Sequence, residues 1–415
     1  MISINQAVIL CGGMGTRLRP LTDNLPKPMA PVNGVPFLQY LIFQMKHQGI
    51  YEFLLLTGYL SDAIKEYFGN GADFGVNIRY SEGPAEWETA KRIWEAQDLI
   101  SESFILLYSD NYTPININRL ANFHDQFDVS ASVVLCQKSN GNIKVDDSGM
   151  IKIYDSTRKS EELDFVEIGY TLVKKSRIFK YINGSNESFS NVLARLVIDH
   201  NLSGMKHPDK YQSISDLKRL RDAETFLSNQ KIILIDRDGT INQKAPRGEY
   251  IAHWKDFHFI DDTVLAMQQL SSLGFSFIVI SNQAGIGRGM VSQIDVDDIH
   301  HRMISYLSAS GILVHRVYYC PHHWEDNCNC RKPNPGLFLK ASEDFRLLLD
   351  RVLYIGDDPR DSIAAENANS RCILLQHSVD ETLDFNVGSS ETVESLSSAI
   401  PSILQHYRNW DVIKK

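Results

Sequence analysis

The chain has 415 residues, 43% of them hydrophobic, and a formal net charge of −9, so it is long enough for two domains that each bury a core. Acidic and basic residues are interspersed without a long basic run, which argues against a nucleic-acid or anionic-membrane partner. No stretch is long and apolar enough to span a membrane, and the first apolar run leads into a glycine loop, so we expect a cytoplasmic protein without a signal peptide.

Strand-like and helix-like patterns alternate through the first half of the chain. Apolar runs begin at Ala7, Phe53 and Phe104, and the helical patterns "SDAIKEYFGNG" and "NINRLANFHDQF" follow the second and third runs. This alternation predicts a doubly wound, Rossmann-like α/β domain whose parallel sheet is flanked by helices.

A glycine-rich loop, "LCGGMGTRLRPLTDNLPKP", follows the first strand and begins at Leu10. Glycines let backbone N–H groups approach a triphosphate closely, and Arg17 and Lys27 can neutralise the charge of a pyrophosphate leaving group. The stretch resembles the sugar-1-phosphate nucleotidyltransferases, and the similarity covers roughly residues 5–225.

That resemblance implies a nucleoside triphosphate, GTP by family similarity, as the co-substrate and a sugar phosphate as the acceptor. It implies that Asp110 binds Mg²⁺ and aligns the sugar phosphate, and that Glu167 and Gly169 belong to the sugar pocket. The residues implied to hold the nucleotide are Gly12, Gly13, Gly15, Thr16 and Arg17, with Lys27 on a phosphate.

Two positions depart from the nucleotidyltransferase pattern. Glu88 stands where the family carries a glycine, and Ser213 stands where it carries a second metal-binding aspartate. Losing one of two carboxylates should weaken Mg²⁺ binding, although waters and substrate phosphates can also serve as ligands. We therefore predict an active domain, with a degenerate sensor or docking module as the alternative.

A helical pattern over residues 215–230 ends just before a second opening strand, so we predict domains 1–229 and 230–415. The second half repeats the alternation in "KIILIDRDGT", "FSFIVISNQAG", "VHRVYYC" and "RVLYIGDDP", which predicts a second doubly wound domain. The tail "TVESLSSAIPSILQHYRNWDVIKK" predicts a closing helix on this domain, and a homo-oligomer formed through that helix is the alternative.

Polar residues stand at the ends of the predicted strands of the second half. They are Asp236 and Asp238, then Ser281, Lys332 and Asp357. Because open α/β sheets bind ligands at the carboxyl ends of their strands, we expect these residues to form one site. A nucleophile, a hydroxyl, an ammonium group and a distant acid together form a phosphoryl-transfer set.

The chemistry of phosphoryl transfer suggests a role for each of these residues. The carboxylates of Asp236 and Asp357, with the backbone carbonyl of Asp238, can hold a Mg²⁺ that offsets the repulsion between the nucleophile Asp236 and a phosphate. Lys332 and Ser281 would hold the remaining phosphate oxygens. Asp238 would protonate the leaving oxygen and then take a proton from the attacking water.

The second half resembles the haloacid dehalogenase superfamily over about residues 231–375, and within it the heptose 1,7-bisphosphate phosphatases, through "DRDGTIN" and "SNQAGIGRG". The segment between the first two motifs is too short for a large cap, so the resemblance implies an open, capless site. Asp358 stands where we expect the family to carry a lysine. The residues implied to contact the sugar or a distal phosphate are Asn282, Arg247, Arg288 and Arg331, and Arg331 is also a candidate catalytic residue.

The stretch "CPHHWEDNCNCRKPNP" precedes Lys332 and matches a zinc loop of that family. The resemblance implies the ligands Cys320, His322, Cys328 and Cys330, with His323 as the competing ligand. Four nitrogen and sulfur ligands leave no open position, so the Zn²⁺ would be structural. Cysteines without a metal are the alternative.

The two halves fit one reaction sequence. Removing the 7-phosphate of a heptose 1,7-bisphosphate gives a heptose 1-phosphate, which is the type of substrate that a sugar-1-phosphate nucleotidyltransferase accepts. We therefore predict a bifunctional enzyme of nucleotide-activated heptose biosynthesis. The alternatives are a phosphatase with an inactive N-terminal domain, and a histidinol-phosphate phosphatase.

Overall fold

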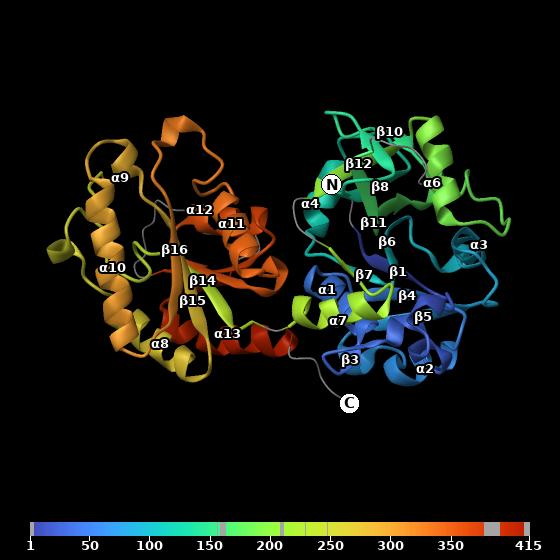
Figure 1. The fold of residues 1–415 in the computed structure, drawn as a ribbon, viewed down its shortest axis with the longest axis horizontal. Helices are drawn as coiled ribbons and strands as arrows, with labels where there is room; N and C mark the ends of the chain where they lie inside the picture. The colour runs from blue at the N-terminus through green and yellow to red at the C-terminus, as the bar shows by residue number, and fades with distance from the viewer. Residues whose placement is uncertain are drawn as a thin grey trace. The chain divides into compact units, whose positions relative to one another are not determined.

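The structure is a computed structural model that describes residues 4–155, 157, 163–207, 211–228, 230–246, 248–376 and 391–410. The chain divides into two compact units, the first running to Ser228 and the second following it. Figure 1 shows the elements of each unit along the chain. None of the helices in the described part of the chain is long and apolar enough to cross a membrane.

The first unit is built on a mixed sheet whose central part is parallel. The strands β1 (Gln6–Cys11), β4 (Glu52–Thr57), β5 (Asn77–Glu82) and β6 (Ser103–Tyr108) lie in the order β6-β1-β4-β5 and run parallel. Helices α3 (Thr89–Glu95) and α6 (Phe189–Ile198) contribute to the core on one face of this sheet, where they pack with Val8 and Leu10. The predicted Rossmann-like arrangement is confirmed for this part.

The rest of that sheet is antiparallel, which the prediction of a parallel sheet did not include. β11 (Phe165–Lys174) runs antiparallel to β6 and to β8 (Ala131–Gln137). β12 (Leu202–His207) pairs with β8, and β9 (Ile143–Val145) and β10 (Ile151–Tyr154) extend the edge. No helix separates β8, β9, β10 and β11 in the described residues, and strands joined without a crossover helix pair antiparallel.

The remaining elements of the first unit surround the sheet. The helices are α1 (Phe37–His47), α2 (Ser61–Phe68), α4 (Ile117–His124), α5 (Lys175–Ile178) and α7 (Leu217–Phe226). The short strand pairs are β2 (Pro31–Val32) with β3 (Val35–Pro36), and β7 (Asn111–Tyr112) with β13 (Gln212–Ser213). The second pair brings Ser213 into register with Asn111, one residue from Asp110.

The second unit has a six-stranded parallel sheet in the order β16-β15-β14-β17-β18-β19. Its strands are β14 (Ile232–Ile235), β15 (Ser276–Asn282), β16 (Val314–Cys320), β17 (Leu353–Gly356), β18 (Arg371–Leu375) and β19 (Glu391–Val393). Its helices are α8 (Asp261–Ser272), α9 (Ala284–Gly287), α10 (Gln293–Ala309), α11 (Gly336–Phe345), α12 (Pro359–Asn367) and α13 (Leu396–Trp410). The predicted second doubly wound domain is confirmed.

Alternating side chains of the central strand β14 bury both faces of this sheet. Ile233 and Ile235 pack with α8, α10 and α13, whereas Ile232 and Leu234 pack with α11 and α12. The strand is therefore apolar throughout, as expected where helices cover both faces. The last helix, α13, is tied to the sheet by Tyr407, whose hydroxyl donates to the Ile232 carbonyl and accepts from the Leu353 amide at 3.3 Å.

Candidate active sites

The carboxyl ends of three neighbouring strands form a pocket in the second unit. Asp236 follows the central strand β14, Ser281 lies near the end of β15, and Asp357 follows β17. Lys332 reaches the same place from the loop between β16 and α11. The residues that line the pocket are Asp236, Asp238, Lys244, Ser281, Asn282, Lys332, Asp358, Arg360 and Asp361.

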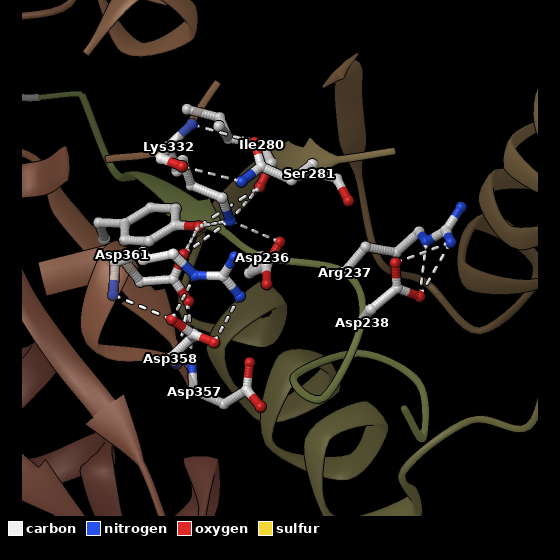
Figure 2. Close-up of polar contacts among 12 residues, drawn as sticks. Asp236, Arg237, Asp238, Ile280, Ser281, Lys332, Asp357, Asp358 and Asp361 are labelled. Atoms are coloured by element: carbon white, nitrogen blue, oxygen red, sulfur yellow. Dashed lines mark hydrogen bonds and ion pairs between the residues drawn. The ribbon is translucent and has the colours of Figure 1, made fainter. Parts of the chain in front are cut away.

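Lys332, which lines the pocket, lies between two carboxylates, and Figure 2 shows its contacts. Its side chain is only 3% exposed, and its Nζ lies 2.8 Å from Asp236 Oδ1 and 2.7 Å from Asp361 Oδ1. It also donates to the Ile280 carbonyl and the Tyr354 hydroxyl. Burial alone would lower the pKa of Lys332, but the charges of Asp236 and Asp361 outweigh burial and raise it, so the ammonium group stays charged.

Asp361 was missed by the sequence analysis, although it is almost fully buried at this site. Its Oδ2 accepts from the backbone amides of Asp357 and Asp358, at 3.1 and 3.2 Å, and its Oδ1 contacts Lys332. The spacing of Asp358 and Asp361 around a proline is the capping-box pattern at the start of α12, and that pattern was the available signal. Asp361 therefore fixes both the loop after β17 and the ammonium group of Lys332.

Three carboxylates gather closely enough to hold a cation. Asp236, Asp357 and Asp361 each offer an oxygen within 4.8 Å of the others. Asp357 Oδ1 is buried without a hydrogen-bond donor, and the buried Asp236 Oδ1 has the Lys332 ammonium group 2.8 Å away. Carboxylate oxygens are the hard ligands that Mg²⁺ prefers, so the residues present fit the expected ion.

The electrostatics of these carboxylates also favour a bound cation. Burial raises the pKa of Asp236 to about 6, with a contribution from the charge of Asp361 and in spite of Lys332. Burial raises the pKa of Asp357 to about 7, although the ion pair with Lys244 opposes the shift. A bound cation would offset the unfavourable burial of these two carboxylates in their charged forms.

Asp238 points away from the three-carboxylate cluster and toward Arg237, as Figure 2 shows. Its carboxylate accepts from Arg237, from Asn242 at 3.0 Å and from Gln283 at 2.7 Å. Burial would raise the pKa of Asp238, but the charge and hydrogen bonds of Arg237 outweigh burial and hold it below its usual range. Asp238 is thus a carboxylate at neutral pH. The metal ligand predicted for Asp238 is its backbone carbonyl and not this side chain.

Buried Arg237 is anchored on its other side by His300. The Arg237 side chain is 1% exposed, and its Nη1 lies 2.9 Å from His300 Nε2 on α10. Burial and the charge of Arg237 lower the pKa of His300 to about 3, so the imidazole is neutral and accepts this hydrogen bond. Neither residue was singled out from the sequence.

The residues predicted to contact the substrate occupy different environments. Asn282 holds the backbone of Lys332 through two hydrogen bonds. Arg288 lies over the rings of Tyr250 and Trp324, with its Cζ at 5.7 and 4.8 Å from the ring centres. Arg331 is half-buried with its Nη1 unpaired, and Arg247 lies outside the described residues. The pocket itself shows two cations that were not predicted, Lys244 and Arg360.

The cysteine-rich loop gathers four potential ligands. His322 Nδ1 lies 3.1 Å from Cys330 Sγ and 3.6 Å from Cys320 Sγ, and Cys328 Sγ lies 3.5 Å from both other sulfurs. Ligand atoms around a tetrahedral Zn²⁺ at about 2.3 Å would lie at comparable separations, so the four residues fit the ion. The competing His323 instead accepts from the Glu325 amide and begins a short helical turn.

In the first unit, the glycine loop brings two predicted residues together. Gly15 has a φ of 60°, and a Cβ there would lie 2.8 Å from Lys27 Cβ, so only glycine lets the loop approach Lys27 this closely. Lys27 Nζ lies 2.5 Å from Asp110 Oδ2. Gly169 donates its amide to Glu167 at 2.8 Å, whereas Thr16 and Arg17 are exposed at the start of a 3-10 turn.

The two departures in the first unit have distinct structural settings. Ser213 accepts from Arg219 at 3.0 Å, and the same guanidinium donates to Ser215, so an arginine lies where the family pattern places a carboxylate. In the part of the chain that the structure describes, no group of three or more potential metal ligands includes Asp110. Glu88 is exposed at the start of α3.

Arg92, which the sequence analysis did not consider, lies against the glycine loop. It is buried and donates to the carbonyls of Gly12, Thr57 and Pro84. A Cβ at Gly12 would lie 2.2 Å from the Arg92 guanidinium. Arg92 therefore ties together the carboxyl ends of β1, β4 and β5.

The second unit thus has the parallel sheet and strand-end carboxylates of a haloacid dehalogenase-type phosphatase without a large cap, and the first has the fold of a nucleotidyltransferase. A family model described as "Nucleotidyl transferase" matches residues 6–169, and one described as "Polynucleotide kinase 3 phosphatase" matches residues 231–374. The two matches fall in different units.

Known relatives match the two units separately. A probable D-glycero-D-manno-heptose-1,7-bisphosphate 7-phosphatase of Thermoplasma volcanium is 39% identical over 127 residues, which are 31% of this chain and 85% of the relative. A probable glucose-1-phosphate cytidylyltransferase of Bacillus subtilis is 30% identical over 240 residues, 52% of this chain and 93% of the relative. A crystal structure of D,D-heptose 1,7-bisphosphate phosphatase from B. bronchiseptica with magnesium and phosphate is 26% identical, with a TM-score of 0.39 over 42% of this chain and 99% of that one.

The chain belongs to the heptose-1,7-bisphosphate 7-phosphatase family through its second unit and to the sugar-1-phosphate nucleotidyltransferase family through its first. It is a fusion of the two.

Proposed function

We propose that the second unit hydrolyses the 7-phosphate of D-glycero-D-manno-heptose 1,7-bisphosphate through an aspartyl-phosphate. The observation that carries this proposal is Asp236, a buried carboxylate at the carboxyl end of the central strand whose Oδ1 lies 2.8 Å from Lys332 Nζ. Family membership supports the choice of substrate, since the relatives of this unit are named for that bisphosphate.

The reaction begins when a carboxylate oxygen of Asp236 attacks the phosphorus, and the bond from phosphorus to the sugar oxygen breaks. Lys332 and Ser281 hold phosphoryl oxygens. Asp238 is ionised at rest, and a phosphate dianion arriving beside it raises its pKa, so it can gain a proton and pass it to the leaving oxygen. Asp238 then takes a proton from the water that hydrolyses the aspartyl-phosphate.

Mg²⁺ held by the carboxylates of Asp236 and Asp357, with the backbone carbonyl of Asp238, would supply the positive charge that lets an anionic nucleophile approach a phosphate. Asp361 belongs to the same cluster, but both of its oxygens already accept from Lys332 or backbone amides, so it serves to position these groups. Zn²⁺ on Cys320, His322, Cys328 and Cys330 would order the loop that carries Arg331 and Lys332.

The nucleotidyltransferase unit would transfer a nucleotidyl group to the heptose 1-phosphate that the phosphatase releases. Lys27 and Asp110 support this step, because they meet beside the glycine loop at the strand ends. The hydroxyl of the sugar is not involved; an oxygen of the sugar phosphate attacks the α-phosphorus, and pyrophosphate leaves. We propose GTP as the donor from the family resemblance, and CTP is the matched comparison because one relative is named a cytidylyltransferase.

A binding module without transferase activity is the second candidate for the first unit. The observation that favours it is the hydrogen bonding of Ser213 to Arg219, which leaves Asp110 without a partner carboxylate from that strand. In this case the unit would bind a nucleotide or a sugar phosphate without reaction.

Phosphate release from heptose 1,7-bisphosphate by the wild type and by Asp236→Asn tests the first activity. The wild type should release one phosphate per sugar. The rate of phosphate release by the variant should be at least about a thousandfold lower, because the variant lacks the nucleophile. Histidinol phosphate serves as the comparison substrate; faster hydrolysis of it would contradict the heptose assignment.

Pyrophosphate release with heptose 1-phosphate and either GTP or CTP tests the second activity. Lys27→Met should abolish it without reducing phosphate release from the bisphosphate. Binding of nucleotide with no pyrophosphate release by the wild type would instead support the binding module.

A further inference from the structure

Arg360 and Asp358 form a fixed pair at the wall of the phosphatase pocket. Arg360 Nε donates to Asp358 Oδ1 and Arg360 Nη2 donates to Asp358 Oδ2, both at 2.8 Å, in the bidentate geometry that suits a guanidinium and a carboxylate. Asp358 is itself held at the start of α12, where it accepts from the Arg360 amide at 3.0 Å. The pair is therefore anchored to the helix.

The pairing with Arg360 neutralises the charge of Asp358, the acidic residue after Asp357. A carboxylate at position 358, where a lysine was expected, would by itself repel a phosphate. Arg360 cancels that charge and keeps half of its surface exposed in the pocket lining. Because Nε and Nη2 engage Asp358, the opposite edge of the guanidinium, with Nη1, faces away from the carboxylate.

The charge balance of the pocket depends on Arg360. Among the described residues, five carboxylates line the pocket or pair with its lining, and four cations oppose them. The carboxylates are Asp236, Asp238, Asp357, Asp358 and Asp361, and the cations are Arg237, Lys244, Lys332 and Arg360. With a divalent cation the pocket carries a net positive charge only while Arg360 is present.

The other three cations each pair with carboxylates of the site, and Lys332 among them is 3% exposed. Arg237 is buried against Asp238 and His300, Lys332 lies between Asp236 and Asp361, and Lys244 pairs with Asp357. Arg360 combines a rigid anchor with a free edge in the pocket.

We propose that Arg360, positioned by Asp358, binds the oxygens of the phosphoryl group that is transferred, in the place of the lysine expected at position 358. The proposal rests on the proposed phosphatase function of this pocket. Arg360 is then a substrate-binding residue, and Asp358 is a positioning residue that acts through it.

The test uses a substrate without a sugar, so that it does not depend on the heptose assignment. Hydrolysis of p-nitrophenyl phosphate by the full chain with Mg²⁺ gives KM and kcat, and inorganic phosphate as a competitive inhibitor gives Ki. Arg360→Gln should raise KM and Ki by roughly ten- to hundredfold, the effect of one hydrogen bond to a charged group, with a smaller change in kcat. Arg360→Lys should recover part of the loss, since it keeps the charge without the planar fork.

The double variant Asp358→Asn with Arg360→Gln separates binding from simple neutralisation. Asparagine still caps a helix, so Asp358→Asn should preserve α12. If Arg360 binds phosphate, the double variant should keep a Ki within about threefold of Arg360→Gln. A double variant with the wild-type Ki would overturn the proposal, because Arg360 would then serve only to neutralise Asp358. An unchanged Ki in Arg360→Gln would overturn it as well.

Calorimetric binding of inorganic phosphate in the presence of Mg²⁺ decides the question if p-nitrophenyl phosphate is a poor substrate. The wild type and the same three variants should rank in the same order of affinity for phosphate. Hydrolysis of p-nitrophenyl phosphate without hydrolysis of heptose 1,7-bisphosphate would contradict the proposed substrate. The role of Arg360 could still be tested with p-nitrophenyl phosphate in that case.

Discussion

Each unit places a lysine beside an aspartate at the carboxyl ends of its sheet, but the two pairs differ in their surroundings. Lys332 is 3% exposed and lies between Asp236 and Asp361, whereas Lys27 is 15% exposed and pairs with Asp110. The phosphatase residues hold one another through shared hydrogen bonds, so that removing one leaves others buried without a partner. In the first unit, the position in register with Asn111 carries Ser213, which is paired with Arg219.

Removing each lysine should show this contrast most strongly. Lys332→Met should destabilise the second unit by about 3–5 kcal/mol, because it leaves two buried carboxylates without their cation. Lys27→Met should lower the free energy of unfolding of the first unit by less than about 1 kcal/mol, because the pair of Lys27 with Asp110 is partly solvated. Hydrogen exchange of β14 and β1 amides in increasing urea measures the two units separately. Equal losses would show that burial does not distinguish the pairs.

Loss of zinc should destabilise the second unit alone. Cys328→Ser should abolish the bound zinc measured by elemental analysis and lower the unfolding temperature of this unit by several degrees, because the ion would order the loop that carries Lys332. Cys372→Ser is the matched control, since Cys372 lies in β18 of the same unit and outside the cluster. Retention of zinc by Cys328→Ser would contradict the assigned ligands.

Acid should weaken the second unit through His300. Burial lowers its folded-state pKa to about 3, so between that pH and the unfolded value of 6.5 only the unfolded chain takes up the proton. Stability is therefore complete above pH 6.5 and decreases as the pH falls, by up to about 1.4 kcal/mol per pH unit. His300→Gln still offers Arg237 an acceptor but does not titrate. Urea unfolding should show that the free energy of unfolding falls between pH 6.5 and pH 5 by about 1.5 kcal/mol less in the variant than in the wild type. An equal fall in the two proteins would exclude His300 as the cause.

Restoring a carboxylate in the first unit should have the smallest effect. Ser213→Asp places an acid in register with Asn111, next to Asp110. We expect the Mg²⁺ concentration for half-maximal pyrophosphate release to fall several-fold, because a second hard ligand is available. Arg219→Gln in the same background controls for an ion pair between Arg219 and the new carboxylate. No change in either background would show that position 213 does not reach the metal.

The sequence predicted the meeting of Asp236, Ser281 and Asp357 because parallel strands end at one edge of a sheet. It also predicted Lys332, through the motif that precedes α11. The partners of these residues were harder to predict: Lys244 and Arg360 pair with carboxylates, and such pairs depend on side-chain directions that the pattern of strands does not specify. Asp361 had a local signal in the capping box, which was not used.

The antiparallel part of the first sheet was missed for a different reason. In the described residues from β8 to β11, strands follow one another without intervening helices, so the alternation of strands and helices gives no signal for them. The pattern of residues alone does not distinguish His322 from His323 as the zinc ligand. The structure distinguishes them because the His323 side chain caps the short helical turn that follows it.

The hydrogen bonds of Tyr407 have a consequence for biosynthesis. They join the last helix of the second unit to its first strand, at Ile232, and to Leu353 in β17. A ribosome must therefore translate almost the whole second unit before β14 acquires this partner, whereas the first unit has all of its described elements by Ser228. Domains generally fold in order of synthesis, so the nucleotidyltransferase unit should already be folded while the nascent phosphatase unit still awaits its final helix.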